Sequence, residues 1–333
     1  MSRRHFLFIP ALIASAVFVH ADTPSSGLEE LLFPAAGISR EDVEAASGRP
    51  AKSLFDLYAL AVARTERMAI EGENSVQADA HRNAAIGQFL PQVQLSASKV
   101  YPSVNSGSGY APKSSVALYA QQNIVTGLKE ISAFRKSGSE MKMREYSLRD
   151  AAGKLLVDVS AAYMNAVRVV KEVRNKEKIL ENYRGIEAEL EKRVAIGRSR
   201  PSELLQIRSQ IYSLTAQIES GKNSLEQAQN VLAYLTGVQP PISVDEDFDA
   251  GKPAQPDADP ASLVMARFDV KAAEEQRDMA SAGLVAAYGG FTPDIYVSAG
   301  DRIYQKTMNG HDWYVGLNAT MPLFSGGETL AAV

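Results

Sequence analysis

Apolar residues recur at alternating steps of four and three positions from Leu148 to Val194. Twelve of the fourteen positions in this series are apolar or tyrosine, and the two exceptions are Lys176 and Glu187. A second segment, 204–235, keeps the same spacing, mostly with leucine and isoleucine. Heptads sustained over this length predict two long helices that supercoil against each other, rather than helices of a globular core.

The link between these segments predicts how the two helices are arranged. It reads GRSRPSE over 197–203, where glycine is suited to end one helix and proline to begin the next. We therefore expect an antiparallel coiled-coil hairpin over 127–236 with a short turn at its tip. At about 1.5 Å per residue, its first arm is about 100 Å long.

Strict alternation of apolar and polar residues predicts two β-hairpins, at 90–125 and 291–324. A loop rich in glycine, serine and proline, 102–113, separates the strands of the first hairpin. One face of these strands carries Val93, Leu95, Val116, Leu118, Ile295, Val297, Val315 and Leu317. The opposite face of the first hairpin carries Gln92, Gln94, Ser96, Ser98, Tyr119, Gln121 and Asn123.

The two hairpins belong to an internal duplication. Segments 78–97 and 280–299 share nine identities in twenty aligned columns, including a Phe-x-Pro motif at the start of each hairpin. An alanine-rich stretch that we expect to be helical precedes each motif, at about 54–88 and 260–289. After a shift of three positions for a loop, the residues Val116, Leu118, Ala120 and Gly127 align with Val315, Leu317, Ala319 and Gly326. The repeated unit is much longer than a solenoid repeat.

These patterns divide the chain into five segments. The boundaries that we expect are a signal peptide at 1–21, an N-terminal extension at 22–53, a first repeat at 54–237, an acidic, proline-rich and irregular connector at 238–259, and a second repeat at 260–333. The first repeat ends in the coiled-coil hairpin, whereas the second has only 328–333 after its β-hairpin. A second long helical hairpin is therefore missing.

The beginning of the chain has the features of a secretory signal peptide. Arg3 and Arg4 precede an apolar run over 6–19, and Val19-His20-Ala21 is a small-residue cleavage pattern. Because the run is short for a membrane span of about twenty residues, cleavage near Ala21 is favoured over a membrane anchor. The twin arginines also fit a second export signal, so the general secretory route and the twin-arginine route both stay open.

The composition argues against several functions. The chain has no cysteine, which removes disulfides, thiolate metal sites and cysteine nucleophiles. A formal net charge of −4, with both signs along the whole length, offers no basic field for nucleic acid. The four histidines have no paired metal-ligand spacing, and no phosphate loop, nucleotide fingerprint or nucleophile elbow appears. We predict no catalytic residue, no metal and no cofactor, and hence no enzyme.

The apolar strand faces need a cover, and the residues leave two possibilities. Eleven residues, 91–101, are enough for a tilted strand to cross a bilayer, with apolar residues toward lipid and polar residues toward a water-filled lumen. Four strands cannot close a barrel, so several chains would have to contribute to one. The alternative is a half-buried sheet of a soluble sandwich, whose polar positions would face solvent. The signal peptide, the duplication and the long helical hairpin favour lipid.

The order of these parts resembles the TolC family of outer-membrane efflux proteins. Segment 266–274, ARFDVKAAE, resembles the family's helix start, and segment 321–327, MPLFSGG, resembles its strand-to-helix exit. At the tip, a glycine followed by a hydroxyl, acidic and aliphatic triplet and then an arginine is also similar to the family pattern. Two positions depart from it: Glu203 stands where aspartate is usual, and Ile207 where a small residue is usual.

This resemblance implies a fold that is mainly α with transmembrane β. Each subunit of a homotrimer would give four strands to one twelve-stranded barrel in the outer membrane, above a helical tunnel in the periplasm. Substrates would pass from an inner-membrane pump, and a periplasmic adaptor protein would grip the tip of the tunnel. The adaptor-binding residues that the resemblance implies are Gly197, Arg198, Arg200, Ser202, Glu203, Leu204 and Arg208. Without the resemblance, this tip is equally well interpreted as a solvated basic turn.

The sequence therefore predicts a passive duct of a tripartite efflux or type I secretion system, located in the outer membrane with a periplasmic extension. The missing second hairpin departs from the family pattern and favours a truncated chain. The alternative function is a non-conducting periplasmic or surface coiled-coil protein that binds partners, or an inactive remnant. The exported substrate, the pump and the identity of the adaptor stay undetermined.

Overall fold

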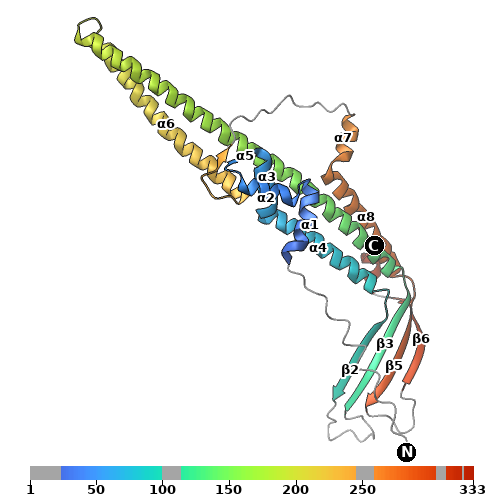
Figure 1. Cartoon of the computed structure of the whole chain (residues 1–333). Coiled ribbons are helices and arrows are strands. Elements are labelled where there is room, and N and C mark those ends of the chain that lie inside the picture. The colour runs from blue at the N-terminus through green and yellow to red at the C-terminus, as the bar shows by residue number, and fades with distance from the viewer. Residues whose placement is uncertain (1–23, 100–113, 245–258, 305–312, 325) are drawn as a thin grey trace, which may run out of the picture. The chain divides into compact units, whose positions relative to one another are not determined.

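The computed structural model describes residues 24–99, 114–244, 259–304, 313–324 and 326–333 (Figure 1). The expected signal peptide and the loop at 102–113 lie outside these residues, as does most of the expected connector. The chain forms two compact units, and each is described by itself. The first contains 1–72 and 151–255, and the second contains 73–150 and 256–333.

The helical hairpin provides most of the first unit. Its arms are α5, Lys129–Ala195, of which 151–195 belong to this unit, and α6, Pro201–Thr236. Every heptad position from 152 to 194 and from 204 to 235 is buried or partly buried. Leu180 of α5 packs with Leu214 and Ile218 of α6 in the seam. The predicted pairing of the two heptad segments is thus confirmed.

The two exceptions in the heptad series both have charged partners. The Lys176 ammonium lies 2.8 Å from Glu172 one turn earlier on α5. The Glu187 carboxylate accepts a 2.8 Å hydrogen bond from Arg208 on the opposite arm. Both side chains therefore sit at the edge of the seam with their charges compensated, which explains why the apolar series tolerates them.

Short elements complete the first unit. They are α1 (Pro24–Ala36), α2 (Arg40–Gly48), β1 (Ala51–Lys52), α3 (Leu54–Arg64) and β4 (Ser243–Val244). Capping boxes start α2 and α3, formed by Ser39 with Asp42 and by Ser53 with Asp56. The connector is not irregular throughout, because β4 pairs in parallel with β1. The left-handed Gly237, with φ 64°, ends α6 just before this pairing.

Each expected alanine-rich helix is in fact two helices. The stretch at 54–88 is interrupted at Thr65, which has an extended ψ of 134° between α3 and α4 (Glu66–Gly87). The stretch at 260–289 is interrupted at Arg267, with ψ 140°, between α7 (Pro260–Ala266) and α8 (Phe268–Gly289). Thr65 and Arg267 occupy equivalent positions of the duplication, so the break itself is duplicated.

An antiparallel four-stranded sheet defines the second unit. Its strands are β2 (Gln92–Lys99), β3 (Ser114–Thr126), β5 (Asp294–Tyr304) and β6 (Trp313–Thr320). The order is β2-β3-β5-β6, so each predicted hairpin forms and the two hairpins join through β3 and β5. Within this unit α5 lies beside both α4 and α8, through His81–Glu140 at 3.1 Å and Lys142–Glu275 at 3.5 Å. A short helix, α9 (Glu328–Ala331), follows the sheet.

Candidate functional site

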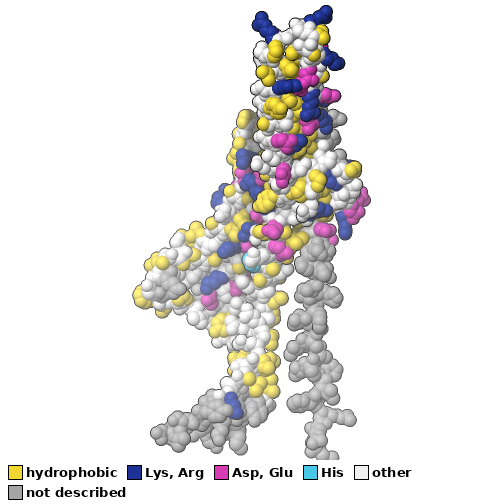
Figure 2. Space-filling view, turned by 90° about the vertical axis from the view of Figure 1, so that its left-hand side faces the viewer, with side chains coloured by type: hydrophobic (Ala, Val, Ile, Leu, Met, Phe, Trp, Pro, Cys, Tyr) yellow, Lys and Arg dark blue, Asp and Glu magenta, His cyan; other side chains and the backbone are white. Residues whose placement is uncertain are grey.

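The strand register sorts the sheet residues into two faces. Directly opposed residues share a face, and Val93, Ala120, Ala299 and Val315 form one continuous row across the four strands. The eight apolar positions singled out in the sequence all lie on the face of this row. No described helix covers that face: Leu95 is 65% exposed and Leu317 is 74% exposed. Hydrophobic side chains accordingly gather over the strand region in Figure 2.

The opposite face of the sheet is polar, uncharged at its centre, and hollowed. A depression of about 440 Å³ is lined by Gln92, Gln94, Tyr119, Ala120, Gln121, Tyr296, Ser298, Ala299, Tyr314 and Asn318. The Asn318 amide donates a 2.8 Å hydrogen bond to the Ser298 hydroxyl on the adjacent strand. The Tyr119 and Tyr314 rings close over Gly300, where a Cβ would lie 3.1 and 2.5 Å from them. Of the expected polar set, Gln92, Gln94, Tyr119 and Gln121 line this depression together.

The remaining polar positions of the first hairpin lie along the same face. Ser96 is opposite Ala117 and Ser98 is opposite Ser115, toward the far end of β2. Asn123 is at the other end, where its amide donates a 3.2 Å hydrogen bond to Glu130. Lys129 and Asp294 form an ion pair at 3.3 Å near this same end. Glu130, Lys129 and Asp294 therefore place charges where the strands meet the helices, and the residues that line the central depression are uncharged.

The second hairpin supplies polar-face residues that the sequence prediction did not name. Tyr296, Tyr314 and Asn318 also line the depression. The signal for them was present, because Asn318 aligns with Tyr119, and Ser298 aligns with Ser96. Extending the polar assignment from one copy of the duplication to the other would have found them.

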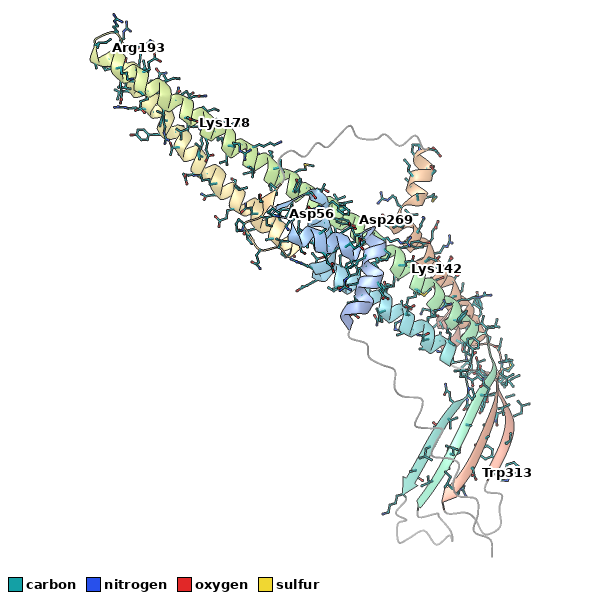
Figure 3. The ribbon with its side chains drawn as sticks, in the orientation of Figure 1. Asp56, Lys142, Lys178, Arg193, Asp269 and Trp313 are labelled. Carbon is teal, nitrogen blue, oxygen red and sulfur yellow. The ribbon has the colours of Figure 1, made fainter. Side chains whose placement is uncertain are left out.

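The tip of the helical hairpin exposes most of its predicted residues. Gly197 has a left-handed φ of 73°, and the Arg198 amide donates a 2.8 Å hydrogen bond to the Arg193 carbonyl. The exposed residues at this turn are Gly197, Arg198, Arg200, Ser202 and Glu203, whereas Leu204 is partly buried. Dark-blue basic side chains mark this end of the helical hairpin in Figure 2, and Figure 3 labels Arg193 just before the turn.

Arg208 differs from the other tip residues because its side chain is hydrogen-bonded to side chains of the same chain. Its guanidinium donates a 2.8 Å hydrogen bond to Glu187 and a second hydrogen bond to Glu191, both on the opposite arm. These hydrogen bonds, the one to Glu187 first, raise the pKa of Arg208 above its ordinary value. Arg208 therefore joins the two arms below the turn, and in this structure it is not available as a free cation.

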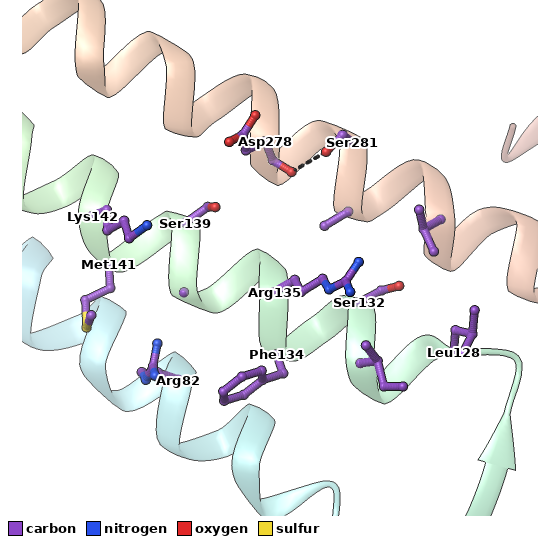
Figure 4. Close-up of a pocket in the computed structure, with 14 residues that line it drawn as sticks. Arg82, Leu128, Ser132, Phe134, Arg135, Ser139, Met141, Lys142, Asp278 and Ser281 are labelled. Carbon is purple, nitrogen blue, oxygen red and sulfur yellow. Dashed lines mark hydrogen bonds between the residues drawn. The ribbon is translucent and has the colours of Figure 1, made fainter.

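Two of the cavities that the described residues form lie between helices. One of about 720 Å³ in the second unit is lined by residues of α4, α5 and α8 (Figure 4). The Arg82 guanidinium lies 5.1 Å from the Phe134 ring centre in its wall. The other, about 640 Å³, lies in the first unit near Thr65 and Tyr234. Among the residues described, no group of three or more histidine, aspartate or glutamate side chains is arranged to hold a metal ion.

No helix in the described ranges combines the length and the hydropathy that a membrane-crossing helix requires.

Sequence comparisons place this architecture among known proteins. A family model described as "Outer membrane efflux protein" matches residues 61–238. The probable outer membrane lipoprotein SilC of Salmonella typhimurium is 26% identical over 215 residues, which cover 60% of this chain and 47% of SilC. The cation efflux system protein CusC of Escherichia coli is 27% identical over 173 residues, covering 50% of this chain and 38% of CusC. The chain thus spans about half the length of these relatives or less.

Solved structures share the fold at low sequence identity. A crystal structure of CusC superposes with a TM-score of 0.72 at 19% identity, covering 84% of this chain and 67% of CusC. The CmeC outer membrane channel of Campylobacter jejuni gives 0.71 at 19% identity, covering 84% and 63% of the two chains. The outer-membrane channel OprN gives 0.69 at 17% identity, covering 93% and 72%.

Proposed function

The chain belongs to the outer membrane efflux protein family, and we propose that it is a subunit of an outer-membrane export channel. The observation that carries the proposal is the sheet, which has an uncovered apolar face and a neutral, hydroxyl- and amide-rich opposite face. A strand set with one face suited to lipid and one suited to water is what the wall of an aqueous membrane pore requires. The predicted lipid-facing and lumen-facing residues take these two roles in the proposal.

The proposed channel is a homotrimer. In the described sheet β2 and β6 are open edges, and unpaired backbone groups are costly inside a bilayer. Three copies would give a closed barrel of twelve strands with no edges. The helices then extend from the barrel into the periplasm as a tunnel, and the protein acts as a passive duct across the periplasm and the outer membrane.

The tip is the proposed docking site for a periplasmic adaptor of a tripartite efflux or type I secretion system. Arg198 and Arg200 are exposed there and form no ion pair with any residue that the structure describes. Ser202 and Glu203 are exposed beside them. Because Arg208 is held by two glutamates, we assign it the role of fixing the arms so that this surface is presented in one shape.

The proposed partners can be tested by charge reversal at the tip. Replacing both Arg198 and Arg200 with glutamate should abolish co-purification of the adaptor and the pump while leaving the helix content unchanged. Replacing Lys178, an exposed residue farther along α5, with glutamate is the matched control and should leave co-purification intact. Equal loss of partners in both variants would contradict the assignment of the tip.

The channel function itself is tested by conductance. The purified chain, reconstituted in a planar lipid bilayer, should give discrete conductance steps and should complement export in a host that lacks its own outer-membrane duct. One relative is named a cation efflux system protein, so tolerance of metal cations is the first export phenotype to measure. A chain that stays soluble without detergent and conducts nothing would instead be a structural coiled-coil protein.

A further inference from the structure

The two halves of the second unit meet at a pair of glycines. A Cβ on Gly127 would lie 2.1 Å from the Gly289 carbonyl oxygen, and a Cβ on Gly289 would lie 1.8 Å from the Gly127 carbonyl oxygen. Both obstructions are backbone atoms, which cannot swing away as the end of a side chain can. The exit of β3 and the end of α8 can therefore approach this closely only because both positions are glycine.

The duplication repeats both glycines, but the chain leaves the second pair open. Gly87 aligns with Gly289, and Gly326 aligns with Gly127. The backbone of the exit turn is also repeated: Gly127 and Leu128 both have φ 62°, and Gly326 and Gly327 have φ 64° and 92°. A Cβ at Gly87 or at Gly326 would nevertheless meet no atom of the described residues within 4 Å. Each repeat thus has one glycine at the end of its helix and another at the exit of its second strand. Gly127 and Gly289 contact each other, whereas Gly87 and Gly326 make no such contact among the described residues.

We propose that Gly326 of one chain packs against Gly87 of a second copy, as Gly127 packs against Gly289 within the chain. This inference rests on the proposed assembly of several copies and adds the register of the seam between them. Within the chain, Ala120 pairs with Ala299 across β3 and β5. In the duplication, Ala120 aligns with Ala319 and Ala299 aligns with Ala97. The equivalent pair between copies is therefore Ala319 on β6 of one chain opposite Ala97 on β2 of the next. The same step places Asn318 opposite Ser98 and Thr320 opposite Ser96.

The chemistry of the two open edges agrees with this register. Ala97 and Ala319 lie on the apolar face of the sheet, and Ser98 and Asn318 lie on its polar face. A slip of one residue would place every apolar side chain opposite a polar one and turn one strand over relative to the other. The seam also pairs the backbone groups of β2 and β6, which are the edge strands of the described sheet.

The glycine contact predicts a variant that folds but does not assemble. Gly87→Ala meets open space among the described residues, and because Gly87 does not have a positive φ, its backbone accepts alanine without strain. Its Cβ should nevertheless collide with Gly326 of the next copy, so oligomers should be lost in detergent while helix content is retained. Gly283→Ala is the matched control, because nothing lies within 4 Å and the aligned position already holds a side chain, that of His81.

The strand register is tested by cysteine cross-linking, for which a chain without cysteine gives no background. Ala97→Cys combined with Ala319→Cys should give disulfide-linked oligomers on a non-reducing gel, and neither substitution alone should. Ala120→Cys with Ala299→Cys is the equivalent pair inside the chain and should give an intramolecular bond. Leu95→Cys with Ala319→Cys, two residues out of register on the same face, should cross-link at least tenfold less.

Several results would overturn the proposal. They are assembly of Gly87→Ala equal to that of the parent, preferential cross-linking of the Leu95 pair, and a parent chain that remains monomeric in lipid. These outcomes are separable from a failure of the proposed function. If oligomers cross-linked through Ala97 and Ala319 conduct no ions, the proposed register between copies stands and the channel function is rejected. If the chain conducts ions but the Ala97 and Ala319 variants do not cross-link, the channel function stands and the proposed register between copies is rejected.

Discussion

The helical hairpin and the sheet place their apolar residues in opposite environments. In the hairpin, each heptad position finds a cover inside the chain, and both Val159 and Leu232 are fully buried. In the sheet, an entire apolar face has no cover among the described residues, with Leu95 and Leu317 mostly exposed. The hydrophobic effect therefore acts among the described residues of one chain in the first region, whereas the second region presents an apolar face that needs a further cover.

The largest expected effect is in the buried seam of the hairpin. Leu232→Ala should lower the free energy of unfolding of the first unit by about 2–5 kcal/mol, because it leaves a cavity in a packed interface. Leu205→Ala, on the same helix but 65% exposed, should change it by less than about 0.5 kcal/mol. Urea denaturation followed by circular dichroism measures both. Equal effects would mean that the arms do not pack as described.

The sheet should respond to charge on one face only. Leu95→Arg should cost about 2–4 kcal/mol in the bilayer and sharply reduce the membrane-inserted fraction, because in the proposed barrel it places a cation in lipid. Gln94→Arg, the adjacent residue on the opposite face, should insert nearly as well as the parent. The measurement is the fraction of chain in washed outer membranes. Insertion of both variants at parental levels would remove lipid as the cover of the apolar face.

Lys52 is a buried cation of the first unit, and like the heptad residues it finds its partners inside the chain. The Lys52 ammonium donates hydrogen bonds to the carbonyls of Ala46, Ser47 and Arg49 at the end of α2. Lys52→Met should cost about 1–3 kcal/mol in thermal or urea unfolding because these carbonyls lose their donor. Lys178→Met, at an exposed site on α5, is the control and should be nearly neutral.

The smallest expected effect is a pH dependence at an exposed helix start. Hydrogen bonds from the Ser39 side chain and then its backbone hold the pKa of the Asp42 carboxyl below its ordinary value. Its folded pKa is lowered, so the stabilisation is complete above the ordinary pKa and is lost as pH falls through the folded one, below about pH 4. Amide hydrogen exchange in α2 between pH 6 and pH 3 should show this loss, and Asp42→Asn should abolish it.

Local patterns were enough to predict the type of nearly every long element. The heptads predicted α5 and α6, because a 3.5-residue period places the same residues on one side of a helix wherever the helix lies. The alternation after Pro91 predicted both faces of the sheet for the same geometric reason. The breaks at Thr65 and Arg267 were missed, since an alanine-rich stretch reads as one helix and neither break has a proline or glycine at its centre.

The sequence by itself determined which residues share a face, where the two helical arms turn and which segments are duplicated, because these depend on periodicity and on glycine and proline. Only the tertiary structure decided which elements meet beyond the helical hairpin and the two strand hairpins. It placed β3 beside β5, paired β1 with β4, and turned Arg208 from a free tip cation into a link to Glu187 and Glu191. Such contacts join residues far apart in the chain, and their geometry depends on how closely two backbones approach, as at Gly127 and Gly289.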